Sequence, residues 1–346
     1  MTNPPETPAI VARGLTMRYV SGPLKTLAGH DIKLQTQFSR WLTEGPKPIR
    51  TLLSLGFESH HALDRLDLTV PQGGIYGFLG QNGAGKTTTI KILVGLLEPV
   101  EGEAFIFGKN VRMPDSRSAV GFMPENPYFY EYLTSLETMQ FYGALSSMPT
   151  ADCKARSIEL LERFGLKDAA NRKVRGFSKG MRQRLGLAQA LLHDPQLVIL
   201  DEPMSGLDPL GRKAIRDAIL DIAARGKTVF FSSHILSDVQ DICDRVCLIH
   251  HGKKIADGRL DSLLEQRVQS VALVVRGLSP DAVARFAATA QSHRTTERGD
   301  WFRYADPESA DAAARAAAGI PGATLVALTP EYESLEAYFV RKTASV

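Results

Sequence analysis

Short apolar segments recur along the middle of the chain, and they do not alternate with polar residues. Four of them, each four or five residues long and rich in β-branched side chains, lie at residues 75–79, 197–200, 228–232 and 246–249. Strands that are buried on both faces of a sheet have this pattern. Helical patterns separate them, notably at residues 182–193 and 212–224. Alternating strands and helices predict a mostly parallel α/β sheet that binds its ligand at the carboxyl ends of the strands.

The segment at about residues 21–61 interrupts this alternation. Its apolar side chains fall near helical spacing, at Leu24, Leu27, Leu34, Phe38 and Trp41. They predict one amphipathic helix, followed by a proline-containing turn at 45–48 and a short apolar piece at 49–57. Five basic and three acidic side chains leave too small a positive charge to attract a membrane surface. Two interpretations stay open: an insertion that folds onto its own domain, or one that docks on a membrane partner or at the membrane interface.

The composition shifts again after about residue 269. Strand-like segments at 271–275, 300–304 and 323–327 alternate with helical patterns at 280–290, 309–318 and 332–342. We therefore predict two domains: residues 1–265, with the insertion and a helical subdomain at about 125–180, and a small α/β accessory domain at 269–346. The second domain carries no catalytic constellation that the sequence makes recognisable.

Length and composition limit the remaining possibilities. With 346 residues, the chain is long enough for one large and one smaller domain. A formal net charge of +3 is slight, so bulk electrostatics indicates neither nucleic acid nor an anionic membrane as a partner. The first ten residues lack the apolar core of a secretory signal, and no apolar run approaches the roughly 18 residues of a membrane span. We expect a soluble chain whose membrane connection runs through a partner.

Cysteine usage adds one candidate metal site. Three cysteines, an odd number, do not form a disulfide framework, which fits a reducing cytosol. Cys243, Cys247, His250 and His251 lie close enough in the sequence to suggest zinc. The order argues against it, because residues 246–249 have the pattern of a buried strand, in which Cys247 is a small core residue.

The strongest motif is Gly-Gln-Asn-Gly-Ala-Gly-Lys-Thr at residues 80–87, between a predicted strand and a helical run at 88–97. Glycines let backbone N–H groups wrap around phosphate oxygens, and the following helix points its positive dipole end at the same anion. Lys86 adds a charge for the β- and γ-phosphates, and the Thr87 hydroxyl is placed to bind Mg²⁺. The spacing differs from that of a dinucleotide fold. The sequence therefore predicts a nucleoside triphosphate site.

Acids and a histidine follow later strands of the predicted sheet. Asp201 and Glu202 come directly after the strand at 197–200. Asp201 at the strand exit suits a role beside Mg²⁺, whereas Glu202 is free to face the γ-phosphate and to polarise an attacking water as a general base. His234 follows the strand at 228–232, and a donor there can hold the γ-phosphate and the water in line.

The octet Phe-Ser-Lys-Gly-Met-Arg-Gln-Arg at 177–184 opens a predicted helix with Ser178 as its N-cap. With the phosphate loop before it, and Asp201-Glu202, Ser-Gly-Leu-Asp at 205–208 and His234 after it in that order, the chain resembles the ATP-binding cassette (ABC) ATPases. The resemblance covers roughly residues 10–257 apart from the insertion. It implies a P-loop NTPase fold with an ABC-type nucleotide-binding domain, a helical subdomain, and ATP with Mg²⁺ as ligands.

The resemblance also implies residue roles. Tyr19 is similar to the aromatic residue that stacks on adenine, and Asp208 matches a loop that crosses the interface between two cassettes. Ser178 and Gly180 match the signature motif, whose helix N-terminus faces the γ-phosphate bound to a second copy, so that a homodimer sandwiches two ATP molecules head to tail. The remaining implied contacts with the nucleotide come from Asn82, Gly83, Gly85, Lys86, Thr87 and Thr88. Thr87, Glu125 and Asp201 are the implied ligands of Mg²⁺. The implied catalytic residues are Glu202, His234 and Lys86.

Two departures from the family pattern point to a branch. The usual signature Leu-Ser-Gly-Gly-Gln reads Phe-Ser-Lys-Gly-Met, and the hinge motif at 121–125, which senses Mg²⁺ and touches the membrane subunit, ends in Glu125 instead of Gln. Both variants, and a C-terminal extension ending in Ser-Leu-Glu-Ala-Tyr-Phe at 334–339, resemble the exporter cassettes for antibiotics, lipids or sodium. A Glu125 carboxylate can bind Mg²⁺ but cannot donate a hydrogen bond.

The sequence thus predicts the cytosolic ATPase subunit of an exporter, peripheral to the membrane through a separate permease and without a nucleic-acid partner. An importer ATPase and a catalytically idle, regulatory cassette are the alternatives. A soluble ABC protein acting on ribosomes or DNA is disfavoured, because the chain has one phosphate loop and no sustained heptads. A GTPase is disfavoured because no Asn-Lys-x-Asp motif for guanine is present.

Overall fold

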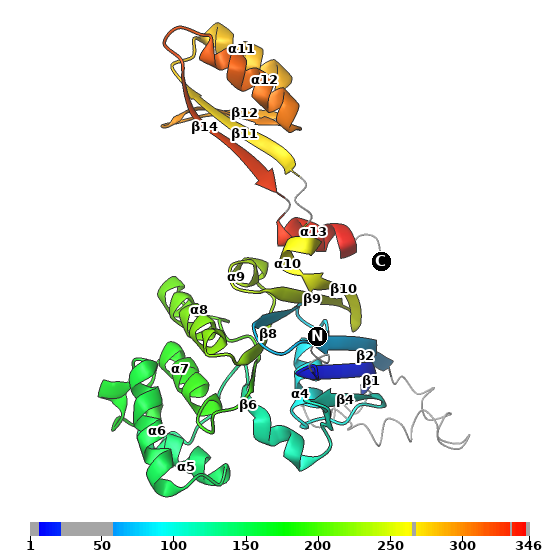
Figure 1. The fold of residues 1–346 in the computed structure, drawn as a ribbon, viewed down its shortest axis with the longest axis vertical. Coiled ribbons are helices and arrows are strands. Elements are labelled where there is room, and N and C mark those ends of the chain that lie inside the picture. Colours follow the sequence, from blue (N-terminus) through cyan, green and yellow to red (C-terminus); the bar gives the residue numbers. More distant parts are fainter. Residues whose placement is uncertain (1–6, 22–57, 265–267, 333, 344–346) are drawn as a thin grey trace, which may run out of the picture. The chain divides into compact units, whose positions relative to one another are not determined.

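The computed structural model describes residues 7–21, 58–264, 268–332 and 334–343. Its contacts divide the chain into two compact units, Met1–Arg259 and Leu260–Val346 (Figure 1). This division falls before residue 265, where the sequence pattern ended the first domain. The predicted amphipathic helix of the insertion and the apolar piece at 49–57 lie outside the described residues.

A six-stranded sheet in the order β10-β9-β3-β8-β7-β6 forms the centre of the first unit. Its strands are β3 (Ile75–Leu79), β6 (Val120–Met123), β7 (Leu197–Leu200), β8 (Thr228–Ser233), β9 (Arg245–His250) and β10 (Lys253–Arg259). All neighbours pair in parallel except β10, which pairs antiparallel with β9. The four predicted strands are confirmed, and β3, β7 and β8 are buried throughout. The first three residues of the hinge motif belong to strand β6, so the loop itself begins at Pro124.

A second, antiparallel sheet of the first unit was not predicted. It has the order β2-β1-β4-β5, from strands β1 (Ile10–Ser21), β2 (Glu58–Val70), β4 (Glu101–Ile106) and β5 (Lys109–Asn110). Strand β2 begins at Glu58, so the predicted end of the insertion at residue 61 is wrong: residues 58–61 pair with the end of β1. Helix α4 (Lys86–Leu93) shares one core with both sheets, to which Ile90, Phe78 and Leu66 contribute. This core fixes the start of α4, and hence the phosphate loop, against β2.

Further helices lie on the chain segments between strands of the parallel sheet. These are α5 (Ser135–Leu145), α6 (Thr150–Arg163), α7 (Lys179–Ala190), α8 (Pro209–Ala224) and α9 (Leu236–Gln240), with short 3-10 turns at Pro114–Ala119, Lys167–Ala169 and Val174–Gly176. Helices α7 and α8 contact the sheet, whereas α5 and α6 pack on each other and on α7. Helix α7 begins three residues before the apolar pattern at 182, because the Ser178 hydroxyl accepts a hydrogen bond from the Met181 N–H and starts the helix there. Asp208 caps α8 in the same way, through the Gly211 N–H.

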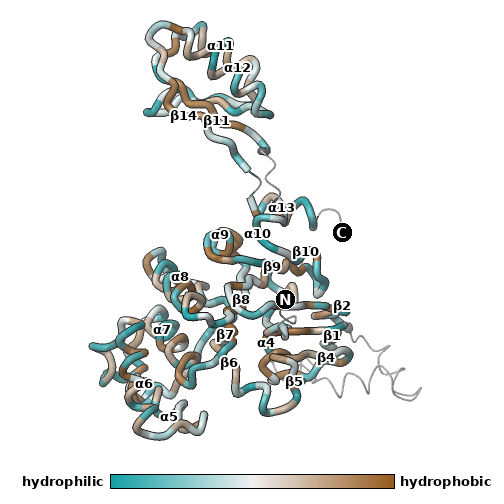
Figure 2. Tube along the Cα trace, viewed as in Figure 1, coloured by the Kyte–Doolittle hydropathy of each residue, from teal (hydrophilic) through white to brown (hydrophobic). Residues whose placement is uncertain are grey.

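The second unit is a four-stranded antiparallel sheet in the order β12-β13-β11-β14 with two helices packed on it. The elements are α10 (Leu260–Leu263), β11 (Val268–Arg276), α11 (Pro280–Thr289), β12 (Ser292–Thr296), β13 (Gly299–Tyr304), α12 (Pro307–Ala318), β14 (Thr324–Tyr332) and α13 (Leu335–Thr343). Figure 2 shows hydrophobic residues along β11 and β14. Strand β12 was not predicted, because all five of its residues are polar and exposed. Tyr332, expected to start the last helix, ends β14.

Candidate nucleotide site

The phosphate loop connects the buried strand β3 to helix α4. Gly83 and Gly85 adopt positive φ angles of 82° and 108°. A Cβ on Gly85 would lie 2.5 Å from the Ala62 carbonyl oxygen of β2, and one on Gly80 would lie 2.5 Å from the Ile249 carbonyl oxygen. Close backbone packing on both sides therefore requires glycine at two positions of this loop.

Lys86, the first residue of α4, folds back over the loop. Its buried Nζ donates to the carbonyl oxygens of Gly80 at 2.7 Å and Gln81 at 3.2 Å. The same Nζ lies 3.1 Å from Oε1 of Glu202, which is also buried. A desolvated ammonium and carboxylate stabilise each other at this distance, and each would be costly alone. The loop therefore holds a fixed positive charge at the start of the helix.

Asp201 and Glu202 follow β7, and Ser232 of the neighbouring strand β8 positions both. The Ser232 hydroxyl donates to Asp201 Oδ1 at 2.6 Å and accepts from the Glu202 N–H at 2.9 Å. Glu202 has a φ of 48°, a left-handed conformation that costs a non-glycine residue on the order of 1–3 kcal/mol. This backbone turn separates the two acids, so that Asp201 faces β8 and Glu202 faces the phosphate loop.

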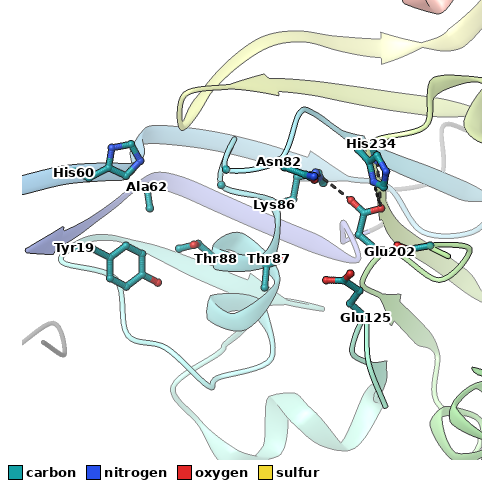
Figure 3. A pocket seen from close by; sticks show the side chains of 13 residues that line it. Tyr19, His60, Ala62, Asn82, Lys86, Thr87, Thr88, Glu125, Glu202 and His234 are labelled. Carbon is teal, nitrogen blue, oxygen red and sulfur yellow. Dashed lines mark hydrogen bonds and ion pairs between the residues drawn. The ribbon is translucent and has the colours of Figure 1, made fainter. Parts of the chain in front are cut away.

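The Glu202 carboxylate lies between two cationic or donor groups. Its Oε2 is 2.7 Å from His234 Nδ1 and 3.4 Å from the His234 N–H, and its Oε1 faces Lys86 (Figure 3). Oε1 is buried, and its close partner among the described residues is the Lys86 ammonium. A carboxylate oxygen with lone pairs to spare, held rigidly by its second oxygen, is suited to accept a proton from a water molecule.

These side chains share one cavity of about 410 Å³. It is lined by Tyr19, His60, Ala62, Asn82, Gly83, Gly85, Lys86, Thr87, Thr88, Glu125, Glu202, Ser205 and His234. Tyr19 and His60 lie at one end of it, and Glu202 and His234 at the other (Figure 3). Sequence reasoning missed His60 and Ala62, since their place depends on how β2 pairs with β1. Asp201 is not part of the lining, and only 3% of its surface is exposed.

Three of the predicted residues lie in a different hollow of the same unit. Ser178, Gly180 and Asp208 line a depression of about 500 Å³ into which the N-termini of α7 and α8 both open. Within one chain, these residues do not reach the cavity that holds Lys86 and Glu202. Two helix N-termini favour an anion in the depression.

The hinge residue Glu125 lines the nucleotide cavity and is tied to the helix that begins at the depression. Gln183 of α7, which is 1% exposed, donates from Nε2 to the Glu125 carbonyl oxygen at 3.2 Å. The loop after β6 is therefore linked by a side chain to the signature helix. The family usually has glutamine at the position of Glu125. The hydrogen bond from Gln183 uses the backbone carbonyl of Glu125, so the change of side chain leaves this bond intact.

The three predicted metal ligands all offer oxygen donors. Thr87 and Glu125 reach the cavity, and Asp201 lies behind it with Oδ1 bonded to Ser232. The described residues contain no group of three or more His, Cys, Asp or Glu side chains that could hold a metal ion by themselves. Mg²⁺ is commonly held by one or two carboxylates or hydroxyls plus phosphate oxygens, so this donor set fits Mg²⁺ that arrives with a nucleotide. Cys247, one of the four residues whose spacing suggested zinc, has no exposed surface, and its burial in β9 raises the pKa of its thiol.

A glycine-rich loop between a buried strand and a helix, facing acids at the ends of neighbouring parallel strands, defines a P-loop nucleoside triphosphatase. Residues 63–205 match the family described as ABC transporter. An uncharacterized ABC transporter ATP-binding protein of Nostoc sp. is 47% identical over 205 residues, which are 59% of this chain and 61% of that protein. Nod factor export ATP-binding protein I of Cupriavidus metallidurans is 33% identical over 268 residues, 76% of this chain and 88% of that protein.

A solved structure of the ATP-binding subunit of an ABC transporter is 28% identical and superposes with a TM-score of 0.57, covering 75% of this chain and 92% of that one. The chain therefore belongs to the ATP-binding proteins of ABC transporters, and it is an ATPase of that class. The predicted P-loop fold is thereby confirmed. No helix of the part of the chain that the structure describes is long and apolar enough to cross a membrane.

Proposed function

We propose that this chain is the energy-coupling subunit of an exporter, in which two copies bind two ATP molecules between them and drive a separate membrane permease. The observation that carries the proposal is the division of the predicted site into two parts. The cavity around Lys86 and Glu202 is lined by all the predicted contacts with nucleotide, whereas Ser178, Gly180 and Asp208 line another hollow of the same unit. A second copy in an isologous arrangement would complete both sites at once.

The chemistry of hydrolysis follows from the cavity. The loop N–H groups and Lys86 bind the β- and γ-phosphates, whose oxygens replace Glu202 as the partner of the ammonium. Glu202 then accepts a proton from water as the water oxygen attacks the γ-phosphorus, and the bond to the bridging oxygen breaks to release ADP and phosphate. Thr87, Glu125 and Asp201 would hold Mg²⁺, which would supply charge that neutralises the phosphates. His234 orients the Glu202 carboxylate from a distance of 2.7 Å.

The second copy would contribute the depression at Ser178 and Asp208. Its two helix N-termini would face the γ-phosphate from the side opposite the loop, and they cost no reorganisation when the charge develops. ATP would then hold the two copies together, and hydrolysis would release them. Differential affinity of ATP for the closed state is what allows binding to do mechanical work.

An exposed aromatic cluster provides the surface that we propose for the permease. Tyr128, Tyr130, Tyr132 and Phe141 follow the hinge residue Glu125, and their exposed fractions are 82%, 45%, 66% and 36%. The Tyr130 ring lies 5.3 Å from Phe141 and 5.7 Å from Tyr132. Exposed aromatic patches of this kind mark protein interfaces. Docking there would place the chain at the cytoplasmic face of the membrane, and the permease would select the substrate.

Export is the direction that we infer. The relative from Cupriavidus is named an export protein, and the signature and hinge variants of this chain resemble those of exporter cassettes. An importer would require a different partner, so identification of the permease that co-purifies with the chain tests the direction.

The assignment of Glu202 is tested by the Glu202→Gln variant of the full chain. We expect it to bind ATP with near-normal affinity, because the amide retains the shape of the carboxylate, and to lose at least about 100-fold in turnover through loss of the base. It should also accumulate a nucleotide-bound dimer in size-exclusion chromatography with ATP. Unchanged hydrolysis would remove Glu202 from the mechanism, and a variant that stays monomeric with ATP would contradict the dimer.

A further inference from the structure

His60 occupies a place in the nucleotide cavity to which no motif assigns a role. It lies directly opposite Tyr19 in the antiparallel pairing of β1 with β2. Directly opposed residues in such a ladder project to the same face, with Cβ atoms about 4.5–5.5 Å apart. Both side chains line the cavity, and Ala62, two residues along β2 on the same face, lines it too. His61, which is paired with Arg18, is not part of the lining.

The backbone of β2 fixes how far His60 lies from the phosphate loop. The Ala62 carbonyl oxygen lies against that loop, because a Cβ added to Gly85 would be only 2.5 Å from it. Two residues of strand carry the chain about 7 Å from Ala62 to His60. A ribose spans a similar length between the phosphates and the base. A nucleotide seated on the loop therefore presents its base to the end of the cavity where Tyr19 and His60 lie (Figure 3).

We propose that His60 is a second stacking partner of the adenine base, so that the imidazole and the Tyr19 phenol, which project from opposed positions of one ladder, both contact the base. A purine consists of two fused rings and is broad enough to cover two side chains that lie side by side in a ladder. Stacking on an aromatic face is tolerant of the exact ring, because it depends on the π surface more than on a particular hydrogen bond. This inference rests on the proposed seating of the triphosphate on the loop.

The test measures binding of ATP and of inorganic tripolyphosphate to the full-length chain by calorimetry. We expect His60→Ala to raise the Kd for ATP about three- to tenfold, the effect of losing one aromatic partner, and to leave the Kd for tripolyphosphate unchanged. His60→Phe should bind ATP like the unmodified chain, since it keeps a ring. His61→Ala is the matched control, one residue away on the opposite face, and should change neither constant.

Each outcome decides the proposal. Unchanged ATP affinity in His60→Ala, an equal loss of ATP and tripolyphosphate affinity, or a His60→Phe variant as weak as His60→Ala would overturn stacking. A Tyr19→Ala variant distinguishes failure of the His60 stacking proposal from failure of the proposed nucleotide site. If Tyr19→Ala weakens ATP binding and His60→Ala does not, only the role of His60 is lost. If Lys86→Ala also leaves ATP binding unchanged, the seating of the nucleotide itself is wrong.

Discussion

Single residues show where sequence reasoning succeeded and where it ended. The identity of the loop glycines, of Lys86 and of Glu202 could be read from their order along the chain, because each follows an apolar strand at a fixed offset. The conformation of Glu202 could not be read, because its left-handed φ depends on the Ser232 hydroxyl of the neighbouring strand. His60 could not be found, because its partner Tyr19 lies on the far side of the insertion in the sequence.

At this scale, the close contact at Gly85 makes a stability prediction. We expect Gly85→Ala to lower the free energy of unfolding by about 2–4 kcal/mol, since the new Cβ combines backbone strain with a clash against the Ala62 carbonyl. Gly83→Ala in the same loop is the control: it also has a positive φ but no atom within 4 Å of its Cβ, and should lose only about 1–2 kcal/mol. Thermal unfolding of the intact variants checks the difference, and equal shifts would contradict the clash.

Among the elements, the strands with a short apolar run were predictable: β3, β7, β8 and β9 of the parallel sheet, and β11, β13 and β14 of the second unit. The antiparallel sheet of the first unit and strand β12 were not predicted. Strand β1 contains Gly14 and Arg18 and has several register shifts, and β12 is entirely polar, so neither carries a periodic apolar signal. Helix α8 begins three residues before its apolar pattern because Asp208 caps it, whereas the start of α7 was indicated by its predicted cap Ser178. Tertiary pairing and capping, more than hydrophobic periodicity, set these elements.

We expect the junction of α7 with β6 to make the stability of the chain depend on pH. His193, just after α7, contacts the Val120 carbonyl oxygen through Nε2 at 3.0 Å, and burial lowers the pKa of this histidine although that hydrogen bond opposes the shift. The unfolded chain therefore binds the proton more tightly, so the stabilising contribution is complete above the unfolded pKa of about 6.5 and is lost as the pH falls below it through the lower pKa of the folded state. We expect His193→Gln, which keeps a donor toward Val120, to show a shallower loss of stability between about pH 7.5 and 5.5. Parallel pH curves from denaturant unfolding would argue against this role.

At the scale of the whole molecule, one chain carries two separate hollows, which we propose to be halves of two different ATP sites. The fold and the position of the nucleotide cavity could be predicted from motif order, because the phosphate loop, Asp201-Glu202 and His234 each follow a strand of one parallel sheet. The identity of the permease and of the transported substrate could not be predicted, because we propose that another chain selects the substrate. The order of motifs also could not tell that Ser178 and Asp208 share a hollow, which depends on the start points of α7 and α8.

The central claim is that each ATP site is built from the loop of one copy and the signature of the other, and one mixing experiment tests it most directly. Lys86→Ala and Ser178→Arg variants of the full chain should each be inactive alone, because every site in either dimer lacks one half. Mixed in equal amounts, half of the dimers are heterodimers with one intact site, so ATPase activity should return to about a quarter of the unmodified level. Mixtures as inactive as the separate variants, or full activity of the Ser178→Arg variant alone, would contradict the composite site.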